Sequence, residues 1–191
     1  MKILLTLFVL LFSSSVVAEN ISDFQIEGIS IGDSLLNYTS RKNILDWKEK
    51  SKRLYWNKDD KYFEVYVEGE FKNYDYLSFF IKSDDDQYLI LAIYGAKEYK
   101  NMIGCNNQYE KINNEFSLLY KKTNEFSGNP GGDTSGRSTL NQTQYKLING
   151  DVILIECYDY DESVQKNEFP NPDSLAVSLN IKEIYSWLNE Y

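Results

Sequence analysis

The chain has 191 residues, enough for one domain, and combines a formal net charge of −9 with the complete absence of histidine. The acidic excess argues against nucleic acid and anionic membrane surfaces as partners. Because no imidazole can accept a nucleophile's proton, Ser-His-Asp and Cys-His catalysis are excluded, together with histidine-ligated zinc.

The first 18 residues have the pattern of a cleaved secretory signal peptide. Lys2 precedes an apolar run from Ile3 to Phe12, and the small residue Ala18 ends the segment. The run is shorter than the roughly 20 apolar residues that a membrane-spanning helix needs. We therefore expect a periplasmic or secreted chain that starts at Glu19 and has no integral membrane span after cleavage.

Alternating apolar residues predict strands at 24–31, 62–68, 76–82 and 88–94. A helix capped by Asp33 or Ser34 should follow the first strand, and apolar spacing predicts another helix over 42–50. The strand at 62–68 alternates apolar Phe63 with polar Glu64, which is typical of a half-buried antiparallel strand. The strand at 88–94 is apolar on both faces and should be central.

In the second half, Tyr109, Ile112 and Phe116 have the spacing of an amphipathic helix over 105–121. The glycine-rich segment 123–142 is expected to be a long flexible surface loop. Asn149-Gly150 favours a hairpin between strands at 144–148 and 151–158. A strand at 175–179 then precedes a final helix, for which Asn180 and Glu183 would form a capping box.

These elements predict an α+β fold with an antiparallel sheet of about six strands and helices packed on one face. Residues 19–191 should form a single domain. A helix followed by a strand meander occurs twice in the predicted order, although no sequence repeat accompanies it.

The two cysteines, Cys105 and Cys157, are expected to form a disulfide, because an isolated pair in an exported protein is usually bridged. The alternative is a pair of free buried thiols.

The stretch "EGISIGDSLL" contains both a G-x-S-x-G and a G-D-S-L motif around Ser30 and Ser34. Both motifs belong to serine hydrolases that require a histidine. We therefore interpret the stretch as a strand, a glycine turn and a capped helix, and we predict no catalytic residue.

Other chemistries have weaker patterns. Ser163 begins an S-x-x-K match in a poor setting for the required helix. Acidic clusters at 64–70 and 159–162 could supply a carboxylate pair, although a solvated strand face is the usual explanation for such residues. The aspartates at 84–86 do not have the spacing of a calcium-binding EF-hand, so no metal site and no cofactor are predicted.

The segment "GDTSGRST" is the strongest candidate for a ligand-binding loop. Asp133, Ser135, Arg137 and Ser138 combine hydroxyls with an arginine that could hold an anion through two hydrogen bonds. No Gly-Lys-Ser/Thr is present, so the segment is not a P-loop. A flexible surface loop without a ligand is the preferred interpretation, with ligand binding as the alternative.

Several segments together resemble a group of uncharacterised exported proteins of AT-rich marine alphaproteobacteria. The resemblance covers residues 23–188 and is carried by "DFQIEGISIGDSLLNY", the two cysteines, "SGRST" and "LAVSLNIKEIYSWL". It implies a periplasmic or secreted α+β domain and supplies no activity or catalytic residues.

The leading hypothesis is a non-enzymatic binding or envelope-associated module, whose partner would be an envelope protein, an extracellular protein or a small ligand. The alternatives are a histidine-independent hydrolase that uses carboxylates or serine, and a small-ligand carrier with a tyrosine-lined cleft, since the chain has 16 tyrosines.

Overall fold

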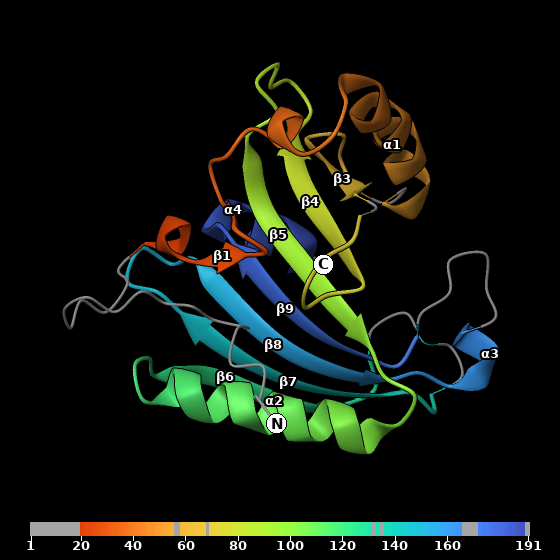
Figure 1. Cartoon of the computed structure of the whole chain (residues 1–191), viewed down its shortest axis with the longest axis vertical. Helices are drawn as coiled ribbons and strands as arrows, with labels where there is room; N and C mark the ends of the chain where they lie inside the picture. The colour runs from red at the N-terminus through yellow and green to blue at the C-terminus, as the bar shows by residue number, and fades with distance from the viewer. Residues whose placement is uncertain are drawn as a thin grey trace.

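Seven strands pair into one antiparallel sheet in the order β3-β4-β5-β9-β8-β7-β6 (Figure 1). The computed structural model describes residues 20–55, 58–67, 69–130, 133, 136–165 and 172–189. The strands of this sheet are β3 (Tyr62–Val67), β4 (Tyr76–Lys82), β5 (Ile90–Glu98), β6 (Lys122–Gly128), β7 (Thr139–Lys146), β8 (Val152–Asp159) and β9 (Ser174–Asn180). The predicted α+β class and antiparallel sheet are confirmed, with seven strands in place of about six.

The predicted repetition of a helix and a meander is present. Helix α1 (Arg41–Leu54) precedes β3, β4 and β5, and helix α2 (Met102–Ser117) precedes β6, β7 and β8. The short helix α3 (Glu162–Gln165) then leads to β9, which pairs with β5 on one side and β8 on the other. Strand β9 therefore joins the two meanders into one sheet, and α4 (Lys182–Asn189) follows it.

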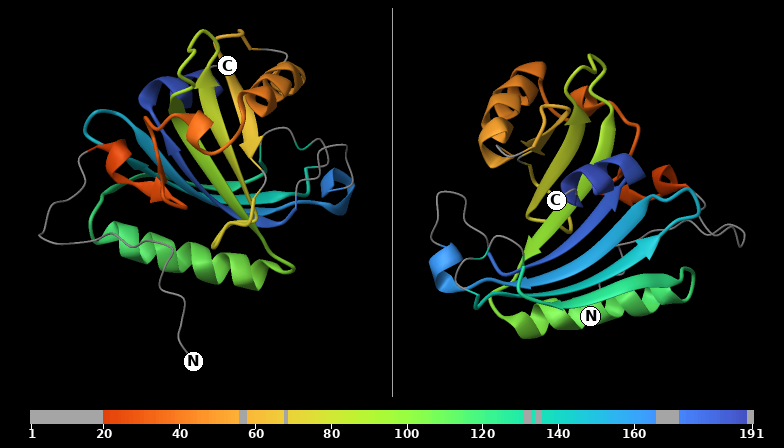
Figure 2. Two further views of the ribbon diagram at one scale, coloured as in Figure 1. Left: turned by 45° about the horizontal axis from the view of Figure 1, so that its top comes forward. Right: turned by 180° about the vertical axis from the view of Figure 1, so that it is seen from behind.

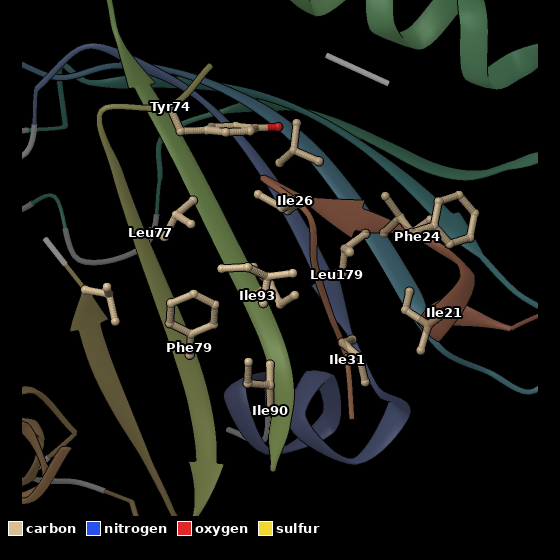
Figure 3. Packing of buried hydrophobic residues seen from close by; sticks show 14 of the residues in the cluster. Ile21, Phe24, Ile26, Ile31, Tyr74, Leu77, Phe79, Ile90, Ile93 and Leu179 are labelled. Carbon is tan, nitrogen blue, oxygen red and sulfur yellow. The ribbon is translucent and has the colours of Figure 1, made fainter. Parts of the chain in front are cut away.

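One face of the sheet, here called the core face, carries the large apolar residues of every central strand. Phe79, Ile93, Ile155 and Val177 belong to one buried cluster on this face. Helix α2 packs against β8 and β9, and the N-terminal segment from Ile21 onward completes the cover. Figure 3 shows residues of that segment packed against the apolar side chains of the sheet.

The opposite face, here called the groove face, is covered at one end by α4 (Figure 2, right). Ile184 and Trp187 pack there against Tyr62, Phe80 and Ala92 in a separate cluster. The helices are therefore divided between the two faces, whereas the sequence placed them on one. The difference arises because the outward residues of β3, β4 and β5 include aromatic side chains that need a cover of their own.

The two edges of the sheet differ. Helix α1 lies along β3, and the hydroxyl of Ser51 accepts a hydrogen bond of 2.8 Å from the backbone N–H of Glu64. Strand β6 is exposed along almost its whole length, with Lys122 and Glu125 paired on its surface. Charges of this kind discourage pairing of a free edge with another chain.

The predicted loop at 123–142 is wrong at both ends. Residues 122–128 and 139–146 are strands β6 and β7, which pair from Lys122↔Tyr145 to Gly128↔Leu140. Strand β6 escaped prediction because it is mostly polar, with Phe126 as its one large apolar residue, so no alternation identifies it. The connection between the strands is confined to 129–138.

The start of the domain also differs from the prediction. The expected strand at 24–31 is a tight hairpin of β1 (Gln25–Ile26) and β2 (Ile29–Ser30), in which Glu27 and Gly28 both have positive φ. Such a turn matches the twist of two antiparallel strands. The helix after Ser34 is a single 3₁₀ turn, η2 (Leu35–Asn37), and no side chain caps it.

The capping box predicted for the last helix is wrong. Asn180 is the final residue of β9, and its amide donates to Ser178 Oγ. The carboxylate of Asp151 takes the capping role, accepting a 3.0 Å hydrogen bond from the backbone N–H of Lys182. A cap contributed by the β7–β8 turn, 31 residues earlier in the chain, has no local sequence signal.

Cys105 on α2 and Cys157 on β8 form the predicted disulfide, with Cα atoms 6.0 Å apart. Both are buried, so the bridge ties α2 to the core face. The predicted signal peptide lies outside the described residues. Among the helices described, none is long and apolar enough to cross a membrane.

We predict that the double substitution Cys105→Ala and Cys157→Ala lowers the free energy of unfolding by roughly 4 kcal/mol, because the bridge closes a long loop in the unfolded chain. The sequence separation is 52 residues. Urea unfolding followed by circular dichroism measures the difference. The wild type in reductant should match the double variant. Two free thiols in the mass of the exported protein would contradict the bridge itself.

Candidate functional site

A groove of about 350 Å³ lies on the groove face, between the meanders and beside α4. Its lining contains two glutamates, Glu64 and Glu156, and several amide and hydroxyl side chains. No lysine or arginine is present among the described residues that line it. The lining tyrosines are Tyr55, Tyr66, Tyr76, Tyr94, Tyr158 and Tyr185.

The groove exists because the central strands carry small residues on this face. Ala92 of β5 and Ser178 of β9 are small residues that line the groove in the middle of the sheet. Tyr94 lies opposite Ser178. Small side chains in the middle of the sheet, with tyrosines around them, leave a floor that larger residues would fill.

The carboxylate of Glu64 on β3 is saturated by hydroxyl donors. Ser78 Oγ donates to its Oε1 at 2.6 Å, and Tyr55 donates to its Oε2 at 2.9 Å. Tyr66 also hydrogen-bonds to this carboxylate. Burial raises the pKa of Glu64, and these three hydrogen bonds oppose the rise. Glu64 therefore organises the wall of the groove next to α1.

The carboxylate of Glu156 on β8 is used asymmetrically. Gln142 Nε2 donates to its Oε1 at 2.6 Å, and the hydroxyl of Tyr158 donates to the same oxygen at 3.0 Å. No hydrogen bond to Oε2 comes from any residue in the described part of the chain. Glu156 is only 4% exposed, and burial raises its pKa. One acceptor oxygen is therefore left for a ligand in the groove that Glu156 lines.

The tyrosines form a connected aromatic wall. The ring of Tyr76 lies 6.2 Å from that of Tyr66 and 6.2 Å from that of Tyr94. Across the sheet, Tyr158 stacks on Tyr160 with the centroids 5.2 Å apart. Burial raises the pKa of Tyr76 to about 12, so its phenol stays neutral near physiological pH. The wall therefore offers aromatic faces and neutral hydroxyls.

The two buried glutamates lie on strands that are well separated in the sheet. Strands β4, β5 and β9 lie between β3 and β8, so four strand spacings, about 19 Å measured along the sheet, separate the two strands. Glycosidases place their two carboxyls roughly 5 to 9.5 Å apart. The strand separation argues against a hydrolytic pair, and of the two carboxylates Glu156 is the one with an oxygen left for a ligand.

The predicted ligand-binding loop is occupied by its own contacts. Arg137 makes two hydrogen bonds of 2.7 Å to Asp161. Asp133 accepts from the backbone N–H of Ser138, whose hydroxyl in turn accepts from the backbone N–H of Asp161. Ser135 lies outside the described residues. The structure therefore brings Asp133, Arg137 and Ser138 together, in a network that ties the β6–β7 connection to the segment after β8.

The serines of the hydrolase motifs have structural roles. Gly28 and Gly32 have positive φ and form turns, and Ser34 Oγ donates to the carbonyl of Gln87 at 2.7 Å. The interpretation of this stretch as a glycine turn is thus supported. Ser163 Oγ donates to Asp161, whereas Lys166 of the S-x-x-K match lies outside the described residues.

The remaining acidic cluster acts as a turn. Asp85 accepts from the backbone N–H groups of Gln87 and Leu89, and Asp84 pairs with Lys82. Within the described ranges, no group of three or more acidic or cysteine side chains is arranged to hold a metal ion.

Sequence reasoning missed Glu156. It lies inside the run Val152–Tyr158, where a single carboxylate among apolar residues was read only as part of a hairpin strand. A charged residue in a buried apolar strand needs a hydrogen-bonding or charged partner, or must be protonated. A lone glutamate in the apolar run of β8 is therefore the signal that would have identified Glu156.

Compared with protein-family models, curated proteins and solved structures, the chain shows no significant match to any. The groove therefore has to be interpreted from its own chemistry.

We predict that Glu64→Gln changes how stability depends on pH. Burial raises the pKa of Glu64 above its ordinary value of 4.5, so the folded state holds a proton that the unfolded state releases. The stabilisation is complete below pH 4.5 and is lost as the pH rises through the folded pKa. The loss is about 1.4 kcal/mol for each pH unit of upward shift.

The measurement is the free energy of unfolding in urea from pH 4 to pH 8. Relative to Glu64→Gln, the wild type should become less stable as the pH rises. Glu183→Gln, at an exposed position on α4, controls for the loss of any surface carboxylate. A difference between wild type and Glu64→Gln that stays constant over this range would refute the prediction.

Proposed function

We propose that the protein is an exported binding module that holds a small polar ligand in the groove of its sheet. The observation that carries this proposal is the groove itself. Its volume of about 350 Å³ lies at the lower end of the range typical of small-molecule sites, about 300 to 1,000 Å³. Its lining of tyrosines, amides and two buried glutamates suits recognition through hydrogen bonds.

The polarity of the groove separates this proposal from a carrier of purely apolar ligands. Gln142, Ser178 and Asn180 contribute polar atoms beside the two glutamates. Polar side chains that remain in a partly buried groove are retained at a desolvation cost. Contacts with a polar ligand would offset that cost and fix its orientation.

Two observations support export. Residues 1–18 have the pattern of a secretory leader, and a bridge such as Cys105–Cys157 is typical of proteins in an oxidising compartment. Both fit a periplasmic or secreted binding protein.

A histidine-independent hydrolase is the second candidate, favoured only by the raised pKa values of Glu64 and Glu156. The four strand spacings between them argue against it. Binding without turnover is therefore the better supported function.

We predict that ligand binding depends on the groove floor. Leu154 lines the groove on β8, and Leu154→Trp should fill part of that space. In thermal-shift measurements against a panel of sugars, nucleosides, amino acids and amines, the wild type should be stabilised by at least one class. Leu154→Trp should lose that stabilisation.

Leu118→Trp is the matched control, because Leu118 is 83% exposed at the end of α2 and is not among the groove residues. It should respond to the same compounds as the wild type. The proposal fails if no compound stabilises the wild type, or if Leu154→Trp and Leu118→Trp respond alike.

A further inference from the structure

We infer that the groove binds a primary ammonium group, with the free oxygen of the Glu156 carboxylate as its anchor. The inference rests on the proposed binding function and names the ligand class. Four features of the described residues carry it: the unequal hydrogen bonding of the two glutamates, a lining without lysine or arginine, the tyrosine faces beside Glu156, and no cluster of acidic side chains that would suit a metal ion.

The first feature is the contrast between two carboxylates in one groove. Glu64 accepts hydrogen bonds from Ser78, Tyr55 and Tyr66, which occupy both of its oxygens. Glu156 receives both of its hydrogen bonds on Oε1. An ionised carboxylate has acceptor sites on both oxygens. Oε2 of Glu156 is therefore the position in the groove where an added N–H donor would find an acceptor.

The second feature is charge. A buried carboxylate is normally paired with a cation or neutralised by protonation. No lysine or arginine lines the groove within the described part of the chain. A ligand ammonium would supply the missing charge, and charge-assisted hydrogen bonds are about twice as strong as neutral ones. The net charge of −9 of the whole chain further attracts cations.

The third feature is the aromatic surface next to Glu156. Tyr158 follows it by two residues on the same face of β8 and donates to its carboxylate. Tyr94 is close enough for a charge on Glu156 to contribute to the raised pKa of its phenol. Faces of tyrosine rings attract organic cations. The site thus combines one anionic acceptor with rings that favour a cationic amine.

The fourth feature separates an amine from a metal ion. Divalent cations need several oxygen ligands, and no group of three or more acidic or cysteine side chains in the described residues could provide them. A primary ammonium needs only a few acceptors, which Glu156 Oε2 and the neighbouring hydroxyls can provide.

The test uses 2-phenylethylamine and its neutral counterpart 2-phenylethanol, titrated by calorimetry into the chain from residue 19 onward near neutral pH. The amine should bind at least about tenfold more tightly than the alcohol, a difference of about 1.4 kcal/mol. Glu156→Gln should reduce the affinity for the amine about tenfold or more, to that of the alcohol. Glu156→Gln removes a buried charge and introduces no larger side chain, so the variant should fold. Its thermal unfolding curve checks that a loss of affinity does not come from unfolding.

Glu183→Gln is the matched control, since it removes an exposed carboxylate on α4 that is not among the groove residues. It should change the affinity for the amine less than about threefold. Equal affinities for amine and alcohol, or equal losses in Glu183→Gln and Glu156→Gln, would overturn the inference. If Leu154→Trp abolishes binding of sugars or nucleosides and amines do not bind, the ammonium assignment is wrong but the binding function stands. If no compound binds in a way that Leu154→Trp abolishes, the ammonium assignment and the binding function are both wrong.

Discussion

The insertion of β9 between β5 and β8 is the constraint on which the rest of the structure depends. Every residue of Ser174–Asn180 is buried, and the strand pairs along its whole length on both sides. Leu175, Val177 and Leu179 point into the core. Without β9 the two meanders would be separate three-stranded sheets, each with two open edges. Both the core and the groove therefore form only when this C-terminal strand is in place.

Strand β9 also explains why the core face is densely packed and the groove face is hollow. On the core face its branched side chains interdigitate with those of β5 and β8. On the groove face it presents Ser178, which lines the groove and is too small to fill the space between the flanking tyrosines. A strand that alternates large and small residues thus builds a dense layer on one side and a hollow on the other.

The sequence predicted most elements because alternation and helical spacing are local signals. Tyr62–Val67 was recognised as a strand, but its outer face was expected to meet solvent. Instead Tyr62 on that face is 7% exposed, because Trp187 of α4 packs against it. A cover that arrives from more than 100 residues later in the chain leaves no mark on the strand that it covers.

Other errors have the same origin. Strand β6 is identified only by pairing with β7, since its own residues are mostly polar and exposed. Asn180 has the residue type of a helix cap, yet Asp151 from another turn performs that role. In the candidate site, the pairing of Arg137 with Asp161 could not be read from spacing alone. In each case a tertiary contact overrode a correct local preference.

The disulfide and the proposed anchor lie on consecutive residues of β8. Cys157 points to the core face and is bridged to α2, whereas Glu156 points to the groove face. The bridge therefore fixes, from behind, the strand that carries the free carboxylate oxygen. A binding group gains affinity when its own position is already fixed, because less conformational entropy is lost on binding. The position of the cross-link is consistent with a strand whose rigidity serves the groove as well as the core.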